Sequence, residues 1–147
     1  MHHYKGAGLA NIYLKNGYRE VMYGDEKAVS VEDLEGLHRT IAGVLIKKTA
    51  PLTGQEFRFL RLEMGLSQLA LGKILWVSDQ AVATWEKEVT KRVPGSAEIL
   101  VRALARERLL HRDGKISDFI EMLANLEDLK PHQFCFQETS KGWQEAA

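Results

Sequence analysis

The 147-residue chain has little cysteine, no long hydrophobic run and no excess of charge of either sign. Its single cysteine, Cys135, excludes an internal disulfide framework and a cysteine-based zinc ribbon. The longest apolar runs, 42–46 and 74–77, are far too short to cross a bilayer, and no basic start precedes an apolar leader. We therefore expect a cytoplasmic protein without a membrane partner. The 20 basic and 20 acidic side chains cancel, which by itself argues against nucleic acid.

The apolar fraction of 45% is enough for a folded core, and the patterns predict a mainly α fold with a small β component. We divide the chain into three parts: 1–51, 52–112 and 113–147. In the first part, Asn16-Gly17 predicts the turn of a β-hairpin. Ser30, with Asp33 three residues later, predicts the start of a helix that runs to Lys47 or Lys48. The first part is thus predicted to be a small hairpin and helix module.

The second part is predicted to form several short helices, each with its own N-cap. Thr53 and Glu56 form a capping-box pattern, and Gly65 ends the helix that they begin. Ser67, Ser78 and Ser96 are each placed to cap a further helix.

The third part predicts a helix through Ile116, Phe119, Ile120 and Leu123, and then a short strand near 133–137. We expect Cys135 to pack in that strand as a small hydrophobic residue. His38, on the apolar side of its helix, is expected to be a core histidine with satisfied hydrogen bonds.

Residues 67–87 carry the strongest functional signal. Two helices of about eight residues are joined by a tight turn, and the second buries only Val82 and Trp85. A short helix with polar residues at its N-terminal end has the shape that enters a major groove. Four residues are predicted to contact bases: Asp79, Gln80, Ala81 and Thr84. Gln80 can hold an adenine edge by two hydrogen bonds, and Thr84 can touch a thymine methyl group.

This pattern resembles the phage-repressor/Cro-type (XRE) helix-turn-helix family. The resemblance rests on Leu66-Ser67-Gln68, Leu71, Leu75, Val77-Ser78, Val82 and Trp85-Glu86, and it covers about 60 residues. Two positions depart from the family pattern: Gly72 stands where alanine is usual, and Trp76 stands where glycine is usual. The resemblance implies a DNA-binding domain at 52–112. It also implies an ion pair between Arg61 and Glu86 that fixes the helices without touching DNA.

The segment Thr53-Gly54-Gln55-Glu56-Phe57-Arg58-Phe59-Leu60-Arg61 makes the layout similar to the MqsA-type antitoxins. Those proteins carry an N-terminal zinc ribbon, whose cysteines this chain lacks. The resemblance implies a metal-free N-terminal module in its place.

The charges are unevenly distributed. Residues 1–52 hold 7 basic and 6 acidic side chains, residues 53–112 hold 10 and 7, and residues 113–147 hold 3 and 7. The basic excess therefore lies in the part that carries the two short helices. Phosphate contacts are predicted for Ser67, Gln68, Ser78, Lys87, Lys91 and Arg92. Four arginines of the following helix are expected to be solvated or interfacial: Arg102, Arg106, Arg108 and Arg112.

We expect a DNA-binding transcriptional regulator that acts as a homodimeric repressor on a palindromic operator, because one helix reads only a few base pairs. Apolar surface for the dimer is predicted from Leu104, Leu109, Leu110, Ile116, Phe119 and Leu123. Two alternatives stay open: an antitoxin whose N-terminal module binds a toxin protein, and a helix-turn-helix interaction module that does not bind DNA. No cofactor or metal site and no enzyme activity is predicted, because no nucleophile with a base, paired acids or metal-ligand spacing stands out.

Overall fold

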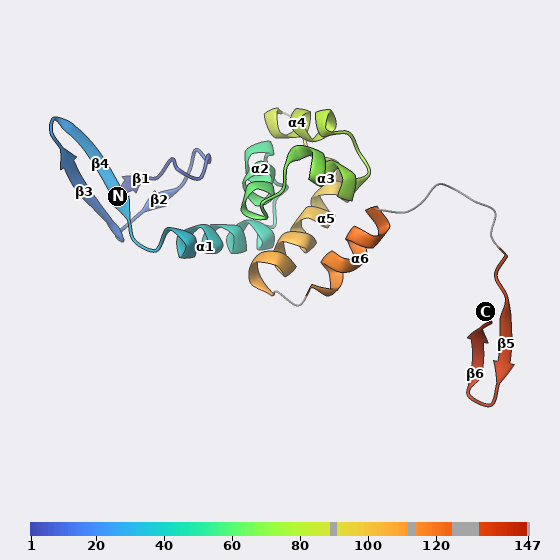
Figure 1. Cartoon of the computed structure of the whole chain (residues 1–147). Helices are drawn as coiled ribbons and strands as arrows, with labels where there is room; N and C mark the ends of the chain where they lie inside the picture. Colours follow the sequence, from blue (N-terminus) through green and yellow to red (C-terminus); the bar gives the residue numbers. More distant parts are fainter. Residues whose placement is uncertain (89–90, 112–113, 125–132, 147) are drawn as a thin grey trace.

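A computed structural model describes residues 1–88, 91–111, 114–124 and 133–146. Helices dominate the described part, and the β structure consists of three two-stranded antiparallel sheets. The prediction of a mainly α fold with a small β component is therefore confirmed. Helices α1 to α6 gather into one body, and the β3–β4 hairpin extends away from it past the beginning of α1 (Figure 1).

The N-terminal part folds as two small sheets. Strand β1 (His2–His3) pairs with β2 (Tyr13–Leu14), and β3 (Tyr18–Tyr23) pairs with β4 (Glu26–Val31). The pairing of Tyr23 with Glu26 leaves Gly24 and Asp25 as the hairpin turn. The predicted turn at Asn16-Gly17 is therefore wrong. Gly17 does have a positive φ of 77°, but it stands at the open end of the hairpin, where its carbonyl accepts from Glu32 N–H.

Helix α1 (Leu34–Lys47) begins later than its predicted cap. Its N-cap is Asp33, whose carboxylate accepts from Gly36 N–H, whereas Ser30 pairs with Arg19 inside the hairpin. The strand pairing takes Ser30 out of reach of the helix, so the prediction for Ser30 is wrong. The predicted end at Lys47 is confirmed.

His38 in α1 lies in a hydrogen-bonded chain that joins three segments. Its Nδ1 lies 2.7 Å from Glu63 Oε1, and its Nε2 lies 2.7 Å from the Tyr4 hydroxyl. Burial and the nearby Glu63 carboxylate raise the pKa of the Tyr4 phenol. The chain ties the N-terminal segment to α1 and α2, as expected of a satisfied core histidine.

Three capped helices follow: α2 (Gly54–Glu63), α3 (Gln68–Leu75) and α4 (Asp79–Lys87). The Thr53 capping box and the Ser67 and Ser78 N-caps are all present, which confirms these predictions. Gly65 follows α2 with φ 71°, so the predicted stop is also confirmed.

Helix α5 (Gly95–Ala105) continues into a π-helical turn, η1 (Arg106–Leu110). Its N-cap is Pro94 without a side-chain bond, so Ser96 lies inside the helix and its predicted role as a cap is wrong. Helix α6 (Lys115–Ala124) packs against α3 and α5, and its N-terminal amides are capped by Glu107. The predicted boundary between 112 and 113 lies outside the described residues.

The C-terminal strands are β5 (Phe136–Thr139) and β6 (Gly142–Glu145), which pair as a hairpin. Strand β5 begins later than predicted. Cys135 precedes it and is exposed, so the expectation that this thiol is packed is wrong.

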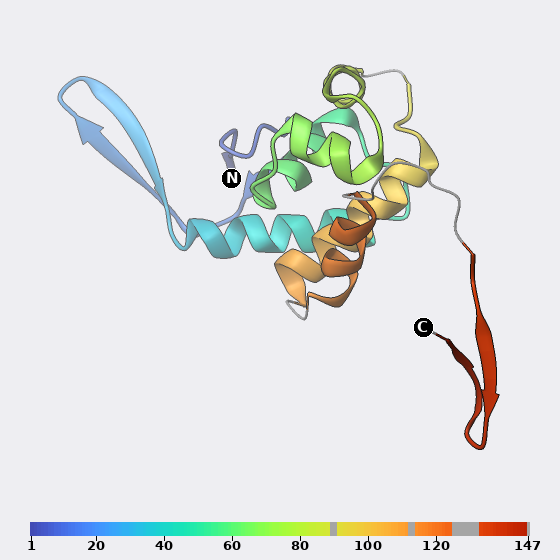
Figure 2. The ribbon, with the colours of Figure 1, turned by 45° about the vertical axis from the view of Figure 1, so that its right-hand side comes forward.

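The main core joins the five helices α1 to α5. Phe57, Leu60, Leu71, Val82 and Val101 are fully buried at its centre. A second cluster of Ile74, Leu104 and Ile120 fixes α6 beside α3 and α5 (Figure 2). Within the described residues, no helix has the length and apolarity that spanning a membrane requires.

Candidate functional site

The unit formed by α3 and α4 has a very tight connection. Trp76 ends α3 in the left-handed region with φ 61°, and Val77 N–H donates to Gly72 O at 2.9 Å. Ser78 then caps α4 by accepting from Ala81 N–H at 3.0 Å. A Cβ on Gly72 would lie only 2.7 Å from the Val77 carbonyl oxygen. The turn therefore needs glycine at 72 because the backbone passes over it closely, and Trp76 adopts the unusual φ instead of a glycine.

A buried ion pair holds this unit on α2. Arg61 Nε donates to Glu86 Oε2 at 2.6 Å, and Arg61 Nη2 donates to Glu86 Oε1 at 2.8 Å. Arg61 Nη1 also donates to the Leu66 carbonyl, and Gln68 Nε2 donates to Glu86 Oε1 at 3.2 Å. The Arg61 and Glu86 side chains are only 7% and 3% exposed. The expected pair is thus present, and its paired hydrogen bonds set the angle between α2, α3 and α4.

Close backbone contact between α2 and α4 reinforces this arrangement at the same end of α4. A Cβ on Gly54 would lie 2.4 Å from the Trp85 carbonyl oxygen and 2.7 Å from that of Glu86. The first turn of α2 is thereby pressed against the last turn of α4. Helix α4 is held at its middle by Val82 and at its end by Glu86, while its first turn remains on the surface.

The exposed side of α4 carries the residues predicted to contact bases. Asp79, Gln80 and Thr84 are exposed, and Ala81 is half-buried. The Asp79 carboxylate accepts from Gln80 N–H at 3.0 Å, and the Thr84 hydroxyl donates to the Gln80 carbonyl at 2.9 Å. The Gln80 side-chain amide has no partner among the described residues. The structure thus places these four residues on one helix. The Gln80 amide is free to bind, whereas the Thr84 hydroxyl is already bonded and leaves only its methyl group for a ligand.

The predicted phosphate contacts fall into two groups. Ser67, Ser78 and Gln68 lie at the beginnings of α3 and α4, but all three have internal roles: two cap helices and Gln68 bonds to Glu86. The second group is basic. Lys87 and Lys91 are exposed and have no partner in the described part of the chain, and Arg92 lies 3.4 Å from Glu98 while remaining 60% exposed.

One neighbouring group was missed from the sequence. A surface cavity of about 550 Å³ brings Gln68 and Lys87 together with Gln55 and Arg58 of α2. Gln55 and Arg58 are exposed and three residues apart, so they share a face of α2. The spacing of Gln55 and Arg58 is visible in the sequence, but the position of these two residues beside Lys87 depends on how α2 packs against α4.

Two of the arginines expected to be solvated or interfacial are instead engaged within the fold. Arg102 donates to the carbonyls of Lys48 and Ala50 at 2.5 and 2.7 Å, and Arg108 pairs with Glu121. These predictions are wrong because the carbonyls beyond α1 and the carboxylate on α6 come within reach only in the folded chain. Arg106 is exposed as expected, and Arg112 lies outside the described residues.

No group of three or more histidine, cysteine or acidic side chains suited to a metal ion occurs in the part that the structure describes. Comparison with protein-family models, curated proteins and solved structures found no match for this chain. The α3–α4 unit and the basic residues that follow it are therefore the features that bear on function.

Proposed function

We propose that this protein is a sequence-specific DNA-binding transcriptional regulator in which α3, the turn at Trp76 and α4 form a helix-turn-helix unit. The observation that carries the proposal is the way α4 is held. Its Glu86 is locked to Arg61 by two short hydrogen bonds, while its capped first turn presents Gln80 to solvent. A short helix fixed at its C-terminal end and free at its N-terminal end can enter a major groove.

The α4 surface suits direct reading of bases. The free amide of Gln80 offers both a donor and an acceptor to an adenine edge, and the Thr84 methyl group can pack on a thymine methyl. Asp79 can accept from a cytosine amino group. Its negative charge is repelled by phosphates, so it disfavours any placement of α4 that brings Asp79 close to the DNA backbone. Lys87, Lys91 and Arg92 follow α4 directly and supply the charge for the DNA backbone.

We further propose that the regulator acts as a homodimer on a palindromic operator, as a repressor of its own gene. A single α4 reads only a few base pairs, so two copies are needed for useful specificity. Of the apolar residues predicted for the dimer, Leu104 belongs to the buried core. Ile116, Phe119 and Leu123 are exposed on α6, and Leu109 and Leu110 are half-buried. The α6 side chains are therefore the better candidates for a dimer contact.

A gel-shift titration with the DNA upstream of the protein's own gene tests the proposal. If Lys87, Lys91 and Arg92 each neutralise one phosphate in each subunit, six contacts give a log–log salt slope on the order of −5. Gln80→Ala should lower discrimination at one base pair, whereas Lys91→Gln should weaken binding to all sequences alike. Lys15→Gln, an exposed charge change in the N-terminal part, serves as the matched control.

The proposal fails if no salt-sensitive, sequence-specific shift appears with folded protein. That result would favour the reading of the helix-turn-helix as a protein-interaction module, for which the carboxylate of Asp79 and the zero net charge are the supporting features. If Gln80→Ala and Lys91→Gln both act only by unfolding the chain, the residue assignments are wrong.

A further inference from the structure

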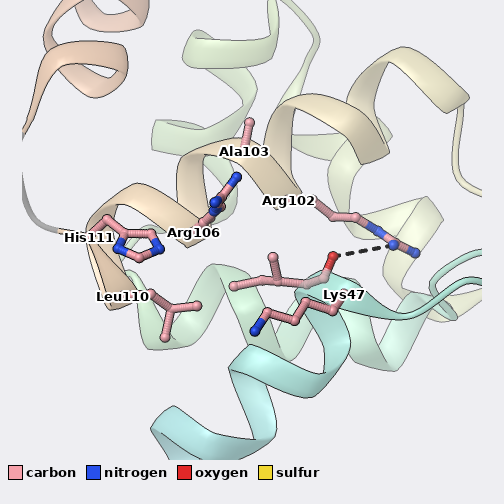
Figure 3. A pocket seen from close by; sticks show the side chains of 7 residues that line it. Lys47, Arg102, Ala103, Arg106, Leu110 and His111 are labelled. Atoms are coloured by element: carbon pink, nitrogen blue, oxygen red, sulfur yellow. Dashed lines mark hydrogen bonds between the residues drawn. The ribbon is translucent and has the colours of Figure 1, made fainter.

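A second cavity lies on another side of the helical body, between the end of α1 and the α5–η1 segment (Figure 3). Its volume is about 560 Å³, which falls in the usual range for small-molecule sites. Its apolar wall consists of Ile46, Ala103 and Leu110. None of the residues predicted to contact DNA lines it, so this site is independent of the proposed function.

The polar lining of the cavity is entirely basic among the described residues. Lys47, Arg102, Arg106 and His111 line it, and no acidic residue does. This concentration is unexpected in a chain with 20 basic and 20 acidic side chains. In Figure 3, Lys47 comes from α1, while Arg106 and His111 come from the opposite wall.

Arg102 has a structural role in this cavity. Its guanidinium donates to the carbonyls of Ile46, Lys48 and Ala50, and Glu98 Oε1 lies 3.9 Å from its Nη2. The carbonyls at the end of α1 are therefore already capped, and the Arg102 charge is partly balanced. Arg102 fixes the frame of the cavity and leaves ligand binding to the other basic residues.

Lys47, Arg106 and His111 are exposed at the cavity, and their side chains have no hydrogen bond or ion pair with other described residues. A basic residue in the last turn of a helix is ordinarily explained by the helix dipole. That explanation suits Lys47 in the last turn of α1 and His111 at the end of η1, but it does not suit Arg106, which stands at the junction of α5 and η1. Three basic side chains without a partner among the described residues line one half-apolar cavity, an arrangement that an anion can complete.

The backbone provides an independent observation at the same place. Residues Arg106–Leu110 form a π-helical turn, a rare conformation that occurs frequently at functional sites. The wider turn leaves Glu107 directed at the amides of Ile116 and Ser117, while Arg106 and Leu110 line the cavity.

We propose that this cavity binds a small organic anion. Its phosphate or carboxylate group would be held by Lys47, Arg106 and His111, and its apolar part would pack on Ile46, Ala103 and Leu110. Because the two walls come from α1 and from α5–η1, the bound anion bridges the helix that carries the N-terminal module and the helix that continues from the core.

Isothermal titration calorimetry of the full chain with phenyl phosphate tests this site, with benzyl alcohol and inorganic phosphate as the two half-probes. We expect saturable binding of one phenyl phosphate per chain, no binding of benzyl alcohol, and binding of inorganic phosphate weaker by about tenfold, since it lacks the apolar contacts. Inorganic phosphate binding as tightly as phenyl phosphate would overturn the role of the apolar wall.

Two variants at the cavity and one control variant locate the binding. Lys47→Gln with Arg106→Gln should weaken phenyl phosphate by about tenfold or more, since two charge-assisted contacts are lost. Lys15→Gln with Lys73→Gln removes the same charge elsewhere and should leave affinity within about twofold. Ala103→Leu fills the cavity without changing charge and should also weaken binding, which provides a second readout if the double variant is poorly folded.

Amide chemical shifts measured during the titration complete the test. They should change at Lys47 and along 103–111. The proposal is overturned if phenyl phosphate shows no saturable binding at millimolar concentration, if the control pair loses as much affinity, or if the shift changes cluster on α3 and α4. The last result would place the anion on the proposed DNA surface, whereas the gel-shift test of that surface does not depend on this cavity.

Discussion

Replacing Arg61 by methionine tests the contact that holds α4 in place. The substitution removes two hydrogen bonds to Glu86 and one to the Leu66 carbonyl. It leaves a carboxylate that is 3% exposed with only the 3.2 Å bond from Gln68. Removing one partner of a buried ion pair costs about 3–5 kcal/mol, because the remaining charge stays desolvated without compensation. That cost is a large share of the ~5–15 kcal/mol that stabilises a domain of this size.

The double variant Arg61→Met with Glu86→Leu separates the cost of an orphaned charge from the worth of the pair. It removes both charges and fills most of the same volume, so the folded protein no longer carries the cost of keeping a charge out of water. The remaining losses are the partners of the Leu66 carbonyl and the Gln68 amide, each worth about 1 kcal/mol where water can replace them. We therefore expect the double variant to be more stable than either single variant.

Urea unfolding followed by far-UV circular dichroism measures all four proteins of this cycle. A loss of less than about 1 kcal/mol of unfolding free energy in Arg61→Met would contradict a structural role for the pair, and so would a double variant that loses as much unfolding free energy as the two single variants together. Gel shifts with the double variant then test function, because a folded chain without the pair should hold α4 less rigidly and bind operator DNA more weakly.

Three further predictions concern backbone geometry and pH. Gly72→Ala should destabilise the protein by about 1–3 kcal/mol in urea unfolding, because the new Cβ would lie 2.7 Å from the Val77 carbonyl oxygen. Gly95→Ala is the control: its Cβ has no neighbour within 4 Å, so the stability should be unchanged or slightly raised. Trp76→Gly should raise the unfolding free energy by about 1 kcal/mol, because φ 61° is strained for tryptophan and its side chain is 67% exposed; a lower stability would mean that the exposed ring packs on its neighbours. Burial alone would raise the pKa of Glu107, but hydrogen bonds from Ser117 and Ile116 and the Arg108 charge lower it below the ordinary 4.5. The contribution of Glu107 is thus present above pH 4.5 and is lost as the pH falls below it. Urea midpoints measured from about pH 6 to about pH 3 should fall less steeply in Glu107→Gln, and equal slopes would contradict the assignment.

The helix caps could be predicted from the sequence because their chemistry is local. Thr53, Ser67 and Ser78 each accept from an amide three residues ahead, so only the short spacing matters. The wrong prediction at Ser30 shows where tertiary structure decides. Ser30 resembles a cap as well as Asp33 does, but strand pairing with Arg19 decides between them. Asn16-Gly17 has the composition of a hairpin turn, and so has Gly24-Asp25. Only the register of β3 with β4 shows that the turn is at Gly24-Asp25.

The candidate site also combines residues that local spacing predicts with residues that only tertiary packing brings together. Its α4 residues follow from one capped helix and could be named from spacing alone. The partners that hold α4 include Gln68, whose amide bonds to Glu86 instead of remaining free for a phosphate. Gln55 and Arg58 join the site only through the packing of α2 against α4. The basic cavity at Arg106 combines residues more than fifty positions apart with a π-helical turn, so no pattern in the sequence indicates it.

The structure also changes what the basic excess of residues 53–112 means for DNA binding. Arg61, Arg102 and Arg108 contribute to that excess but are engaged with Glu86, backbone carbonyls and Glu121. Arg106 faces the separate cavity. Fewer cations than the sequence suggests are therefore available beside α4, chiefly Lys87, Lys91, the partly paired Arg92 and Arg58 of α2. Since phosphate contacts supply most non-specific affinity, one subunit should bind random DNA weakly. The proposed function therefore requires operator affinity to come from base contacts that a second subunit doubles, so it predicts that a monomeric variant loses sequence-specific binding altogether.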